Sequence, residues 1–284
     1  MIAVARPQAQ RTGISAEALA GTPQGFVMPT QRDASISFNN VHLTLGNREI
    51  LRDITMHVDD GEFVCVVGPS GCGKTTMLRL IAGLFQPTLG SVLFKGQPMA
   101  KPRQDIAVVF QDYGKALLPW RTAAGNISLA LEAIGAPKKE WPERIARLLE
   151  TVGLPTHADK YPNQMSGGMQ QRLQIARCLA QEPRVLLMDE PFGALDAMTR
   201  QELQDEVLAI VSKTKATVFF VTHDLEEAIY LGDRVIGMLP NPGTIASTFN
   251  IDLPRPRDQL TTREAPEFLR LRRKLFDFIK NAEA

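Results

Sequence analysis

The sequence is short of cysteine, of long apolar runs and of any excess of charge. Its three cysteines, Cys65, Cys72 and Cys178, are unevenly spaced and lack metal-site spacing, which favours reduced thiols of a cytosolic protein over a disulfide framework. No segment approaches the ~18 to 20 apolar residues that cross a bilayer. The 32 basic and 31 acidic residues leave a formal net charge of +1, which argues against a broadly basic nucleic-acid surface.

The N-terminus also lacks the continuous apolar core of a signal peptide, because Arg6 and Pro7 interrupt it at once. We therefore expect the protein to stay in the cytoplasm. A length of 284 residues permits one large or two small domains, and a hydrophobic content of 44% is ample for a packed core.

Among the motifs that are present, the first reads Gly-Pro-Ser-Gly-Cys-Gly-Lys-Thr over residues 68–75 and fits the phosphate-loop pattern. The apolar run 63–67 before it predicts a buried strand, and residues 77–82 after it predict a helix. This is the context that a phosphate loop requires. A plain Gly-rich turn would need neither Lys74 nor Thr75, so the pattern predicts a nucleotide site.

Each residue type in this loop has a physical reason. The glycines let the backbone approach the phosphates, so that amide groups and the helix N-terminus face the anion. Lys74 would reach the β and γ phosphates, and the Thr75 hydroxyl could ligate magnesium. We expect the thiol of Cys72 to be activated beside these amides, so that its alkylation blocks nucleotide entry. The predicted nucleotide-binding residues here are Gly68, Pro69, Ser70, Gly71, Cys72, Gly73, Lys74, Thr75 and Thr76.

A second apolar run, Val185 to Met188, ends in two adjacent acids, Asp189 and Glu190. A buried parallel strand explains the aliphatic residues but not the acids. Ligands of open α/β sheets bind at the carboxyl ends of the strands, so we expect both acids to face the phosphate loop. Asp189 would hold the magnesium shell, and Glu190 would position or deprotonate the attacking water. The alternative is that one of them, Glu190 above all, caps a helix.

Ser166 is a good helix N-cap, and Met169, Leu173, Ala176 and Ala180 follow it at helical spacing. The open N-terminus of such a helix binds phosphate. Taken alone, the segment could equally be an ordinary capped helix.

The run Ser-Gly-Gly-Met-Gln-Gln-Arg over residues 166–172 resembles the signature motif of ATP-binding cassette (ABC) proteins. The resemblance covers roughly residues 36–256 and has the family's motifs in order. It implies an α/β fold: a P-loop NTPase core with a mixed sheet flanked by helices, an antiparallel β subdomain and an inserted helical subdomain at about 111–178. We expect a flexible tail over 1–33, the ABC ATPase domain over 34–257 and a helical extension over 258–284.

By this resemblance Gln111 matches the Q-loop glutamine, Asp196 lies in the D-loop, and His223 matches the switch histidine that contacts the γ phosphate. A lone histidine after a strand is most often structural or capping, which is the alternative here. The implied catalytic residues are Glu190, His223 and Gln111. The implied magnesium ligands are Thr75, Gln111 and Asp189, and the remaining implied nucleotide contacts are Ser166, Gly167, Gly168 and Asp196.

The resemblance further implies that two copies pair head to tail, with each ATP held between the phosphate loop of one and the signature helix of the other. Internal repeats are absent, so this chain is one half of such a pair. The implied cofactors are ATP and Mg²⁺. The implied partners are transmembrane permease subunits and, indirectly, a solute-binding protein, at the cytoplasmic face of the membrane and without nucleic acid.

The segment 117–122 and the runs 191–200 and 252–257 resemble ATPases of importers for nitrate, aliphatic sulfonates and taurine. A soluble ABC ATPase acting on DNA or the ribosome is the main alternative, although such proteins usually carry a coiled-coil insertion or two fused cassettes. A phosphate-loop kinase is a third reading, and it leaves residues 166–172 unexplained.

Three local questions stay open at this level. Leu118 and Trp120 could form a docking surface for a transmembrane subunit or fill the core. Leu45 stands where the family usually has an adenine-stacking aromatic residue, so stacking would come from elsewhere, with Phe38 as one candidate, or be replaced by aliphatic contact. The amphipathic pattern after residue 266 predicts a packed terminal helix, carried by Phe268, Leu271, Leu275 and Phe278.

Overall fold

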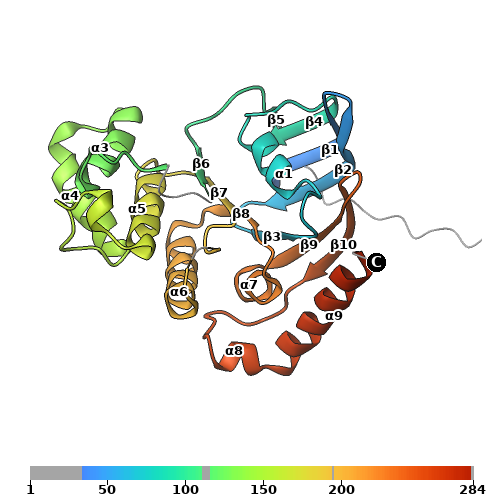
Figure 1. Cartoon of the computed structure of the whole chain (residues 1–284). Helices are drawn as coiled ribbons and strands as arrows, with labels where there is room; N and C mark the ends of the chain where they lie inside the picture. The colour runs from blue at the N-terminus through green and yellow to red at the C-terminus, as the bar shows by residue number, and fades with distance from the viewer. Residues whose placement is uncertain (1–33, 111–115, 194, 283–284) are drawn as a thin grey trace, which may run out of the picture. The chain divides into compact units, whose positions relative to one another are not determined.

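A six-stranded sheet forms the centre of the fold (Figure 1). The computed structural model describes residues 34–110, 116–193 and 195–282. The strand order is β10-β9-β3-β8-β7-β6; all neighbouring strands run parallel except β10, which is antiparallel to β9. These strands are β3 (Phe63–Val67), β6 (Ile106–Val109), β7 (Val185–Asp189), β8 (Thr217–Val221), β9 (Arg234–Leu239) and β10 (Thr244–Asn250).

The central strands are apolar throughout because both faces of the sheet are covered. In β3, Phe63, Cys65 and Val67 pack into one hydrophobic cluster, whereas Val64 and Val66 pack into a second cluster on the opposite face. The same alternation runs through β7 and β8. The predicted strands at 63–67 and 185–189 are confirmed at these bounds, and the one predicted from Ile106 ends at Val109.

A separate antiparallel sheet, of order β2-β1-β4-β5, covers one side of the second cluster. Its strands are β1 (Ala34–Leu45), β2 (Arg48–Asp59), β4 (Leu89–Phe94) and β5 (Gln97–Pro98). Helix α1 (Lys74–Ile81) contacts β4 as well as β7 and β8, so it joins the two sheets.

The chain between β6 and β7 is helical over most of its described part. It comprises α3 (Ala123–Ala133), η1 (Lys138–Glu140), α4 (Trp141–Thr151), η2 (Pro162–Gln164) and α5 (Gly167–Leu179). Helix α5 contacts α3, α4 and strand β6. In Figure 1 these helices group together on the far side of β6, β7 and β8 from α1.

The remaining helices follow the later strands: α6 (Ala197–Thr214), α7 (Leu225–Leu231), α8 (Thr261–Glu264) and α9 (Pro266–Ala282). Helix α9 packs on α7 and β9, and it buries Phe268, Leu271 and Leu275. The terminal helix predicted from this pattern therefore packs on the core. Within the described part of the chain, none of the helices has both the length and the apolar character to span a membrane.

Candidate functional site

The phosphate loop connects the end of β3 to α1, and its glycines meet two geometric demands. A Cβ on Gly68 would lie 2.7 Å from the Met238 carbonyl oxygen and 2.8 Å from the Cys72 sulfur, so no larger residue fits there. Gly73 precedes the first residue of α1 with φ of 99°, a left-handed conformation that favours glycine. The loop thus places the N-terminus of α1 at the carboxyl edge of the parallel sheet.

Lys74 and Thr75 occupy the first turn of α1 and face different neighbours. The Lys74 ammonium is buried and donates hydrogen bonds to the carbonyl oxygens of Gly68 (2.7 Å) and Pro69 (3.1 Å). The Thr75 hydroxyl donates to Asp189 Oδ1 at 3.0 Å, which ties the loop to the end of β7. Burial raises the pKa of Asp189, and the Thr75 hydroxyl partly opposes this effect.

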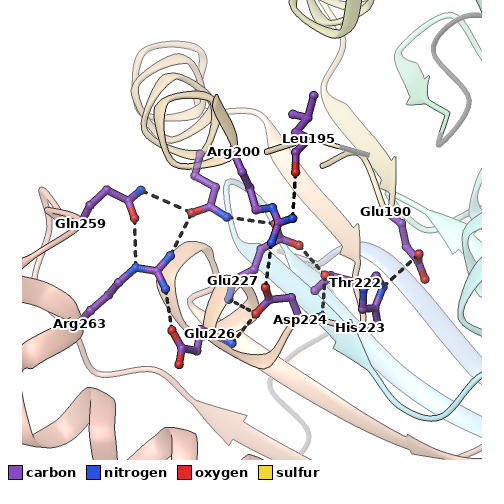
Figure 2. Close-up of polar contacts among 11 residues, drawn as sticks. Glu190, Leu195, Arg200, Thr222, His223, Asp224, Glu226, Glu227, Gln259 and Arg263 are labelled. Carbon is purple, nitrogen blue, oxygen red and sulfur yellow. Dashed lines mark hydrogen bonds and ion pairs between the residues drawn. The ribbon is translucent and has the colours of Figure 1, made fainter. Parts of the chain in front are cut away.

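Glu190 and His223 meet at the carboxyl ends of β7 and β8, with Glu190 Oε2 3.1 Å from His223 Nδ1 (Figure 2). Glu190 has a φ of 44°, a left-handed conformation that costs a non-glycine residue ~1 to 3 kcal/mol. A hydrogen bond of 2.8 Å from its backbone N–H to the Val221 carbonyl oxygen holds it there. Because the surrounding structure maintains this strained backbone, the Glu190 side chain is held in a fixed direction, towards His223.

Ser166 begins α5 as predicted, and its hydroxyl accepts a hydrogen bond from the Met169 N–H at 3.3 Å. Gly168 lies against the start of α6, since a Cβ on it would be 2.7 Å from Thr199 Cγ2. The N-terminus of α6 is capped by Asp196, which accepts from the Thr199 N–H at 3.1 Å. The signature segment and the D-loop are therefore neighbours. In Figure 1, however, α5 lies across the sheet from α1 and the phosphate loop.

The structure thus brings Lys74, Thr75, Asp189, Glu190 and His223 to one edge of the sheet, and it places Ser166, Gly167 and Gly168 at a different helix end. Gln111 lies outside the described residues. Comparisons with known proteins identify the family. A sequence model of the ABC transporter family matches residues 51–193. An uncharacterised ABC transporter ATP-binding protein of Methanocaldococcus jannaschii is 51% identical over 83% of this chain and 86% of its own length.

The chain belongs to the ABC transporter family.

Other relatives are similar over most of this ABC ATPase. The nitrate import ATP-binding protein NrtD of Synechococcus elongatus is 45% identical over 81% of the chain and 84% of its own length. The bicarbonate transport ATP-binding protein CmpD of Synechocystis is 45% identical over 83% and 84%. A solved dimeric bacterial ABC transporter cassette matches with a TM-score of 0.66 and 32% identity, over 76% of this chain and 98% of that one.

These findings confirm the predicted family, fold and class of enzyme: the protein hydrolyses ATP in a reaction coupled to transport. A nitrate import ATP-binding protein is among its relatives, as predicted. A bicarbonate transport ATP-binding protein is a relative of a kind that was not predicted from the sequence.

Two predictions about this ABC ATPase are wrong. The Cys72 thiol is fully buried, and burial raises its pKa, so it is not an activated nucleophile despite its place in the phosphate loop. Phe38 is also fully buried, in the cluster between the two sheets, and cannot stack on adenine. Leu45 is 43% exposed at the end of β1, so its side chain is accessible for contact with a base.

Sequence reasoning missed the residues that hold α7, the helix after His223. Asp224 caps its N-terminus by accepting from the N–H groups of Glu226 (2.9 Å) and Glu227 (3.1 Å). At its other end the buried Arg257 donates to the carbonyl oxygens of Tyr230 and Gly232, both at 2.8 Å. Helix ends leave unpaired carbonyl groups, which this arginine satisfies. The run 252–257, singled out only by resemblance, thus has a structural task.

Glu227 is the buried acid of this region, and its stability effect should depend on pH. Burial raises its pKa from 4.5 to about 7, although hydrogen bonds from Thr222 and Gln204 oppose that effect. Because its pKa is raised on folding, Glu227 binds a proton more tightly in the folded state than in the unfolded state. Its contribution to the unfolding free energy is fully present below about pH 4.5 and is lost as the pH rises towards 7. At about 1.4 kcal/mol per pH unit, the loss amounts to ~3 kcal/mol.

We therefore expect Glu227→Gln to gain stability relative to the wild type between pH 5 and pH 7.5. The uncharged amide has no ionisation penalty, so the difference in unfolding free energy should grow by ~2 to 3 kcal/mol over this range. Urea unfolding of both proteins at the two pH values measures it. A difference that stays constant with pH would show that Glu227 titrates normally.

Proposed function

We propose that the protein is the energy-coupling subunit of an importer for a small solute and that it works as a head-to-tail pair. The observation that carries this proposal is the separation of the two phosphate-binding helix ends in one chain. The phosphate loop lies at α1 and the signature serine lies at α5, across the sheet (Figure 1). Two copies facing each other would bring one end of each kind to each ATP. The dimeric cassette among the solved relatives supports this arrangement.

The residues present fit a magnesium ion beside the triphosphate. Thr75 Oγ1 and Asp189 Oδ1 are hard oxygen donors 3.0 Å apart, and a cation would offset the cost of burying the Asp189 charge. Among residues 34–110, 116–193 and 195–282, no cluster of three or more His, Cys, Asp or Glu could hold a metal alone. Phosphate oxygens and water would therefore complete the shell, together with Gln111. The ion would neutralise charge on the phosphates.

In the proposed reaction each side chain at the sheet edge has one task. Lys74 leaves its loop carbonyls to bind the β and γ phosphates. Glu190 orients the attacking water and accepts its proton, and His223, 3.1 Å away, contacts the γ phosphate and keeps the Glu190 carboxylate oriented. In the paired state Ser166, Gly167 and Gly168 of the other copy would cover the same phosphates, with Asp196 beside them.

A surface that includes Phe110 suits the transmembrane partner. A cleft of about 340 Å³ is lined mainly by apolar side chains, among them the exposed Leu84 and Phe110 and residues of the C-terminal half of α3. We propose that it receives a short amphipathic helix from a permease subunit. Phe110 directly precedes Gln111 in the sequence, so a helix seated there would contact the residue before the predicted Q-loop glutamine.

The turn 117–122 presents Trp120, which is 71% exposed, whereas Leu118 is half-buried. The fully buried Asn126 holds the turn: its side chain bonds the backbone of Leu118, Arg121 and Thr122 at 2.9 to 3.2 Å. The structure thus decides against Trp120 as a core residue. We propose that it forms part of the permease-docking surface.

The solute is proposed from the relatives alone, since specificity belongs to the permease and to a solute-binding protein. NrtD and CmpD are named for nitrate and bicarbonate, both small oxyanions, so we propose a small oxyanion; sulfonates and taurine belong to the same chemical range. The proposed location is the cytoplasmic face of the membrane. A soluble ABC ATPase acting on DNA or the ribosome finds no support among these relatives.

Affinity purification of the tagged protein from gently solubilised membranes, with ATPase activity assayed in the recovered complex, tests the proposal. We expect a polytopic membrane protein to co-purify and nitrate, bicarbonate or a sulfonate with its binding protein to stimulate ATP hydrolysis. Recovery with ribosomes or DNA-repair factors and no membrane protein would contradict the transport role while leaving the ATPase assignment intact.

Trp120→Ala should weaken this association. Loss of an exposed anchoring tryptophan typically costs ~2 kcal/mol or more of binding, so we expect at least about tenfold less permease to be recovered. Leu260→Ala is the matched control, because Leu260 is 72% exposed and lies in the C-terminal extension. Neither change should lower the melting temperature by more than ~2 °C. Equal recovery with both variants would remove Trp120 from the interface.

A further inference from the structure

Glu227 anchors Thr222 and, through it, Asp224, the two residues on either side of His223. The Thr222 hydroxyl donates to one Glu227 carboxylate oxygen and accepts from the Asp224 N–H at 3.0 Å. The other carboxylate oxygen accepts from Gln204 Nε2 at 3.0 Å. Gln204 and Glu227 are both buried. The position of the exposed His223 therefore depends on a buried acid that it does not touch.

Gln204 on α6 connects this acid to the C-terminal extension. Its Oε1 accepts from Arg263 Nη2 at 3.2 Å and from Gln259 Nε2 at 3.4 Å. Figure 2 shows Arg263 and Gln259 at one end of this set of hydrogen bonds, with Thr222, His223 and Glu190 at the other. The C-terminal extension is thus connected to residues 222–224, the switch segment, through the buried side chains of Gln204 and Glu227.

The polarity of these bonds carries the argument. A glutamine amide can turn over, and its neighbours decide which end is oxygen and which is NH₂. A guanidinium has only donors, so Arg263 requires the Gln204 oxygen to face it. The NH₂ group must then face Glu227. Without that donor the buried Glu227 carboxylate loses a partner, and a half-satisfied buried network is costly.

Arg263 is itself held in one orientation. Nη1 donates to Glu226 Oε2 at 2.9 Å, Nε donates to Gln259 Oε1 at 3.1 Å, and the guanidinium lies over the Tyr230 ring at 5.0 Å. Three different neighbours therefore fix the orientation of the Arg263 guanidinium, which contacts Gln204. Arg272, from α9, donates to the same Glu226 at 3.0 Å, and within the described part of the chain its side chain makes no hydrogen bond to Gln204.

The switch segment is tied to the D-loop from the other side. Arg200 Nη1 lies 3.5 Å from Asp224 Oδ2, and its Nη2 donates to the Leu195 carbonyl oxygen at 3.1 Å. His223 thus lies between a link to the D-loop and a link to the C-terminal extension. Loosening either link would let the histidine move relative to Glu190.

We propose that Arg263 is a positioning residue for ATP hydrolysis, which fixes the orientation of Gln204 and, through Glu227 and Thr222, the placement of His223. The C-terminal extension is then part of the hydrolytic machinery rather than a cover for the core. This inference rests on the proposed role of His223 at the γ phosphate.

The test compares Arg263→Ala and Arg263→Lys with the matched control Arg272→Ala in the full chain, by ATPase kinetics and melting temperature. We expect Arg263→Ala to lower kcat about tenfold, as the loss of one charge-assisted hydrogen bond would, with the KM for ATP within about twofold. Arg263→Lys should recover part of the rate, because an ammonium can still donate to Gln204 but lacks the fork. Arg272→Ala should leave both constants unchanged, since an exposed ion pair contributes little.

A double-mutant cycle with Gln204→Met separates positioning from general destabilisation. If Arg263 acts through Gln204, Arg263→Ala should lower kcat no further in the Gln204→Met background. Additive losses would overturn the proposal, as would a kcat for Arg263→Ala equal to that of the Arg272→Ala control.

His223→Ala in the same series distinguishes the two levels of inference. A wild-type kcat for His223→Ala would reject the role of the histidine itself. A large loss for His223→Ala with none for a folded Arg263→Ala would reject only the positioning role of the extension. If Arg263→Ala does not fold, the Arg263→Lys and Gln204→Met variants give the same comparison.

Discussion

Glu190→Gln is expected to bind ATP with unchanged affinity and to hydrolyse it at least ~100-fold more slowly than the wild type. A positioned general base contributes ~10² to 10⁴ in rate, and an amide cannot accept the proton of the attacking water. The amide oxygen can still accept a hydrogen bond from His223, and the side chain keeps its size. The strained backbone of residue 190, with φ of 44°, should therefore keep its conformation. Single-turnover hydrolysis of radiolabelled ATP measures the chemical step directly.

The same variant should accumulate as a dimer when ATP is added, because the pair would close around ATP and fail to reset. Size-exclusion chromatography coupled to light scattering measures this. Glu62→Gln is the matched control: Glu62 is 15% exposed against 23% for Glu190, and it pairs with Arg234 at the opposite end of β3 from the phosphate loop. Near-normal turnover by Glu190→Gln, or equal losses in both variants, would remove Glu190 from the catalytic role.

The sequence predicted the parts of the site that depend on short-range patterns. A strand, a glycine-rich loop and a helix in succession define the phosphate loop, and acids at the end of an apolar strand must lie at the carboxyl edge of a parallel sheet. Both follow from local geometry that any fold of this class imposes. The N-cap at Ser166 is local in the same way, because it needs only the amide of Met169 three residues later.

The sequence did not predict properties that depend on residues far apart in the chain. The Cys72 thiol was expected to be activated by the amides of its loop, yet its sulfur packs where a Gly68 side chain would lie, and burial raises its pKa. Phe38 was named for its chemistry and not for its strand face, which points into the core. Gln204 and Arg263 are 59 positions apart and carry no motif, so only the folded structure reveals the hydrogen bond between them.

Lys74→Ala is expected to weaken ATP binding by at least ~30-fold. Truncating one partner of a buried charge-assisted contact costs ~2 to 5 kcal/mol, and tenfold in affinity corresponds to about 1.4 kcal/mol. In the structure the ammonium is buried among the carbonyl oxygens of Gly68 and Pro69, which hold it in the loop where the phosphates would lie. Isothermal titration calorimetry with a non-hydrolysable ATP analogue measures the affinity without turnover.

Lys95→Ala is the control for this change, because Lys95 forms an exposed ion pair with Asp60 at 2.9 Å between turns that follow β4 and β2, and its loss should leave the affinity unaltered. Because Lys74 also donates two hydrogen bonds to carbonyl oxygens of its own loop, the melting temperature of the Lys74→Ala variant is a second informative measurement. If Lys74→Ala binds the analogue normally but melts at a lower temperature, the ammonium stabilises the loop and does not bind phosphate. If affinity falls while the melting temperature of the free protein stays within ~2 °C, the ammonium exchanges its carbonyl partners for phosphate oxygens when the nucleotide binds.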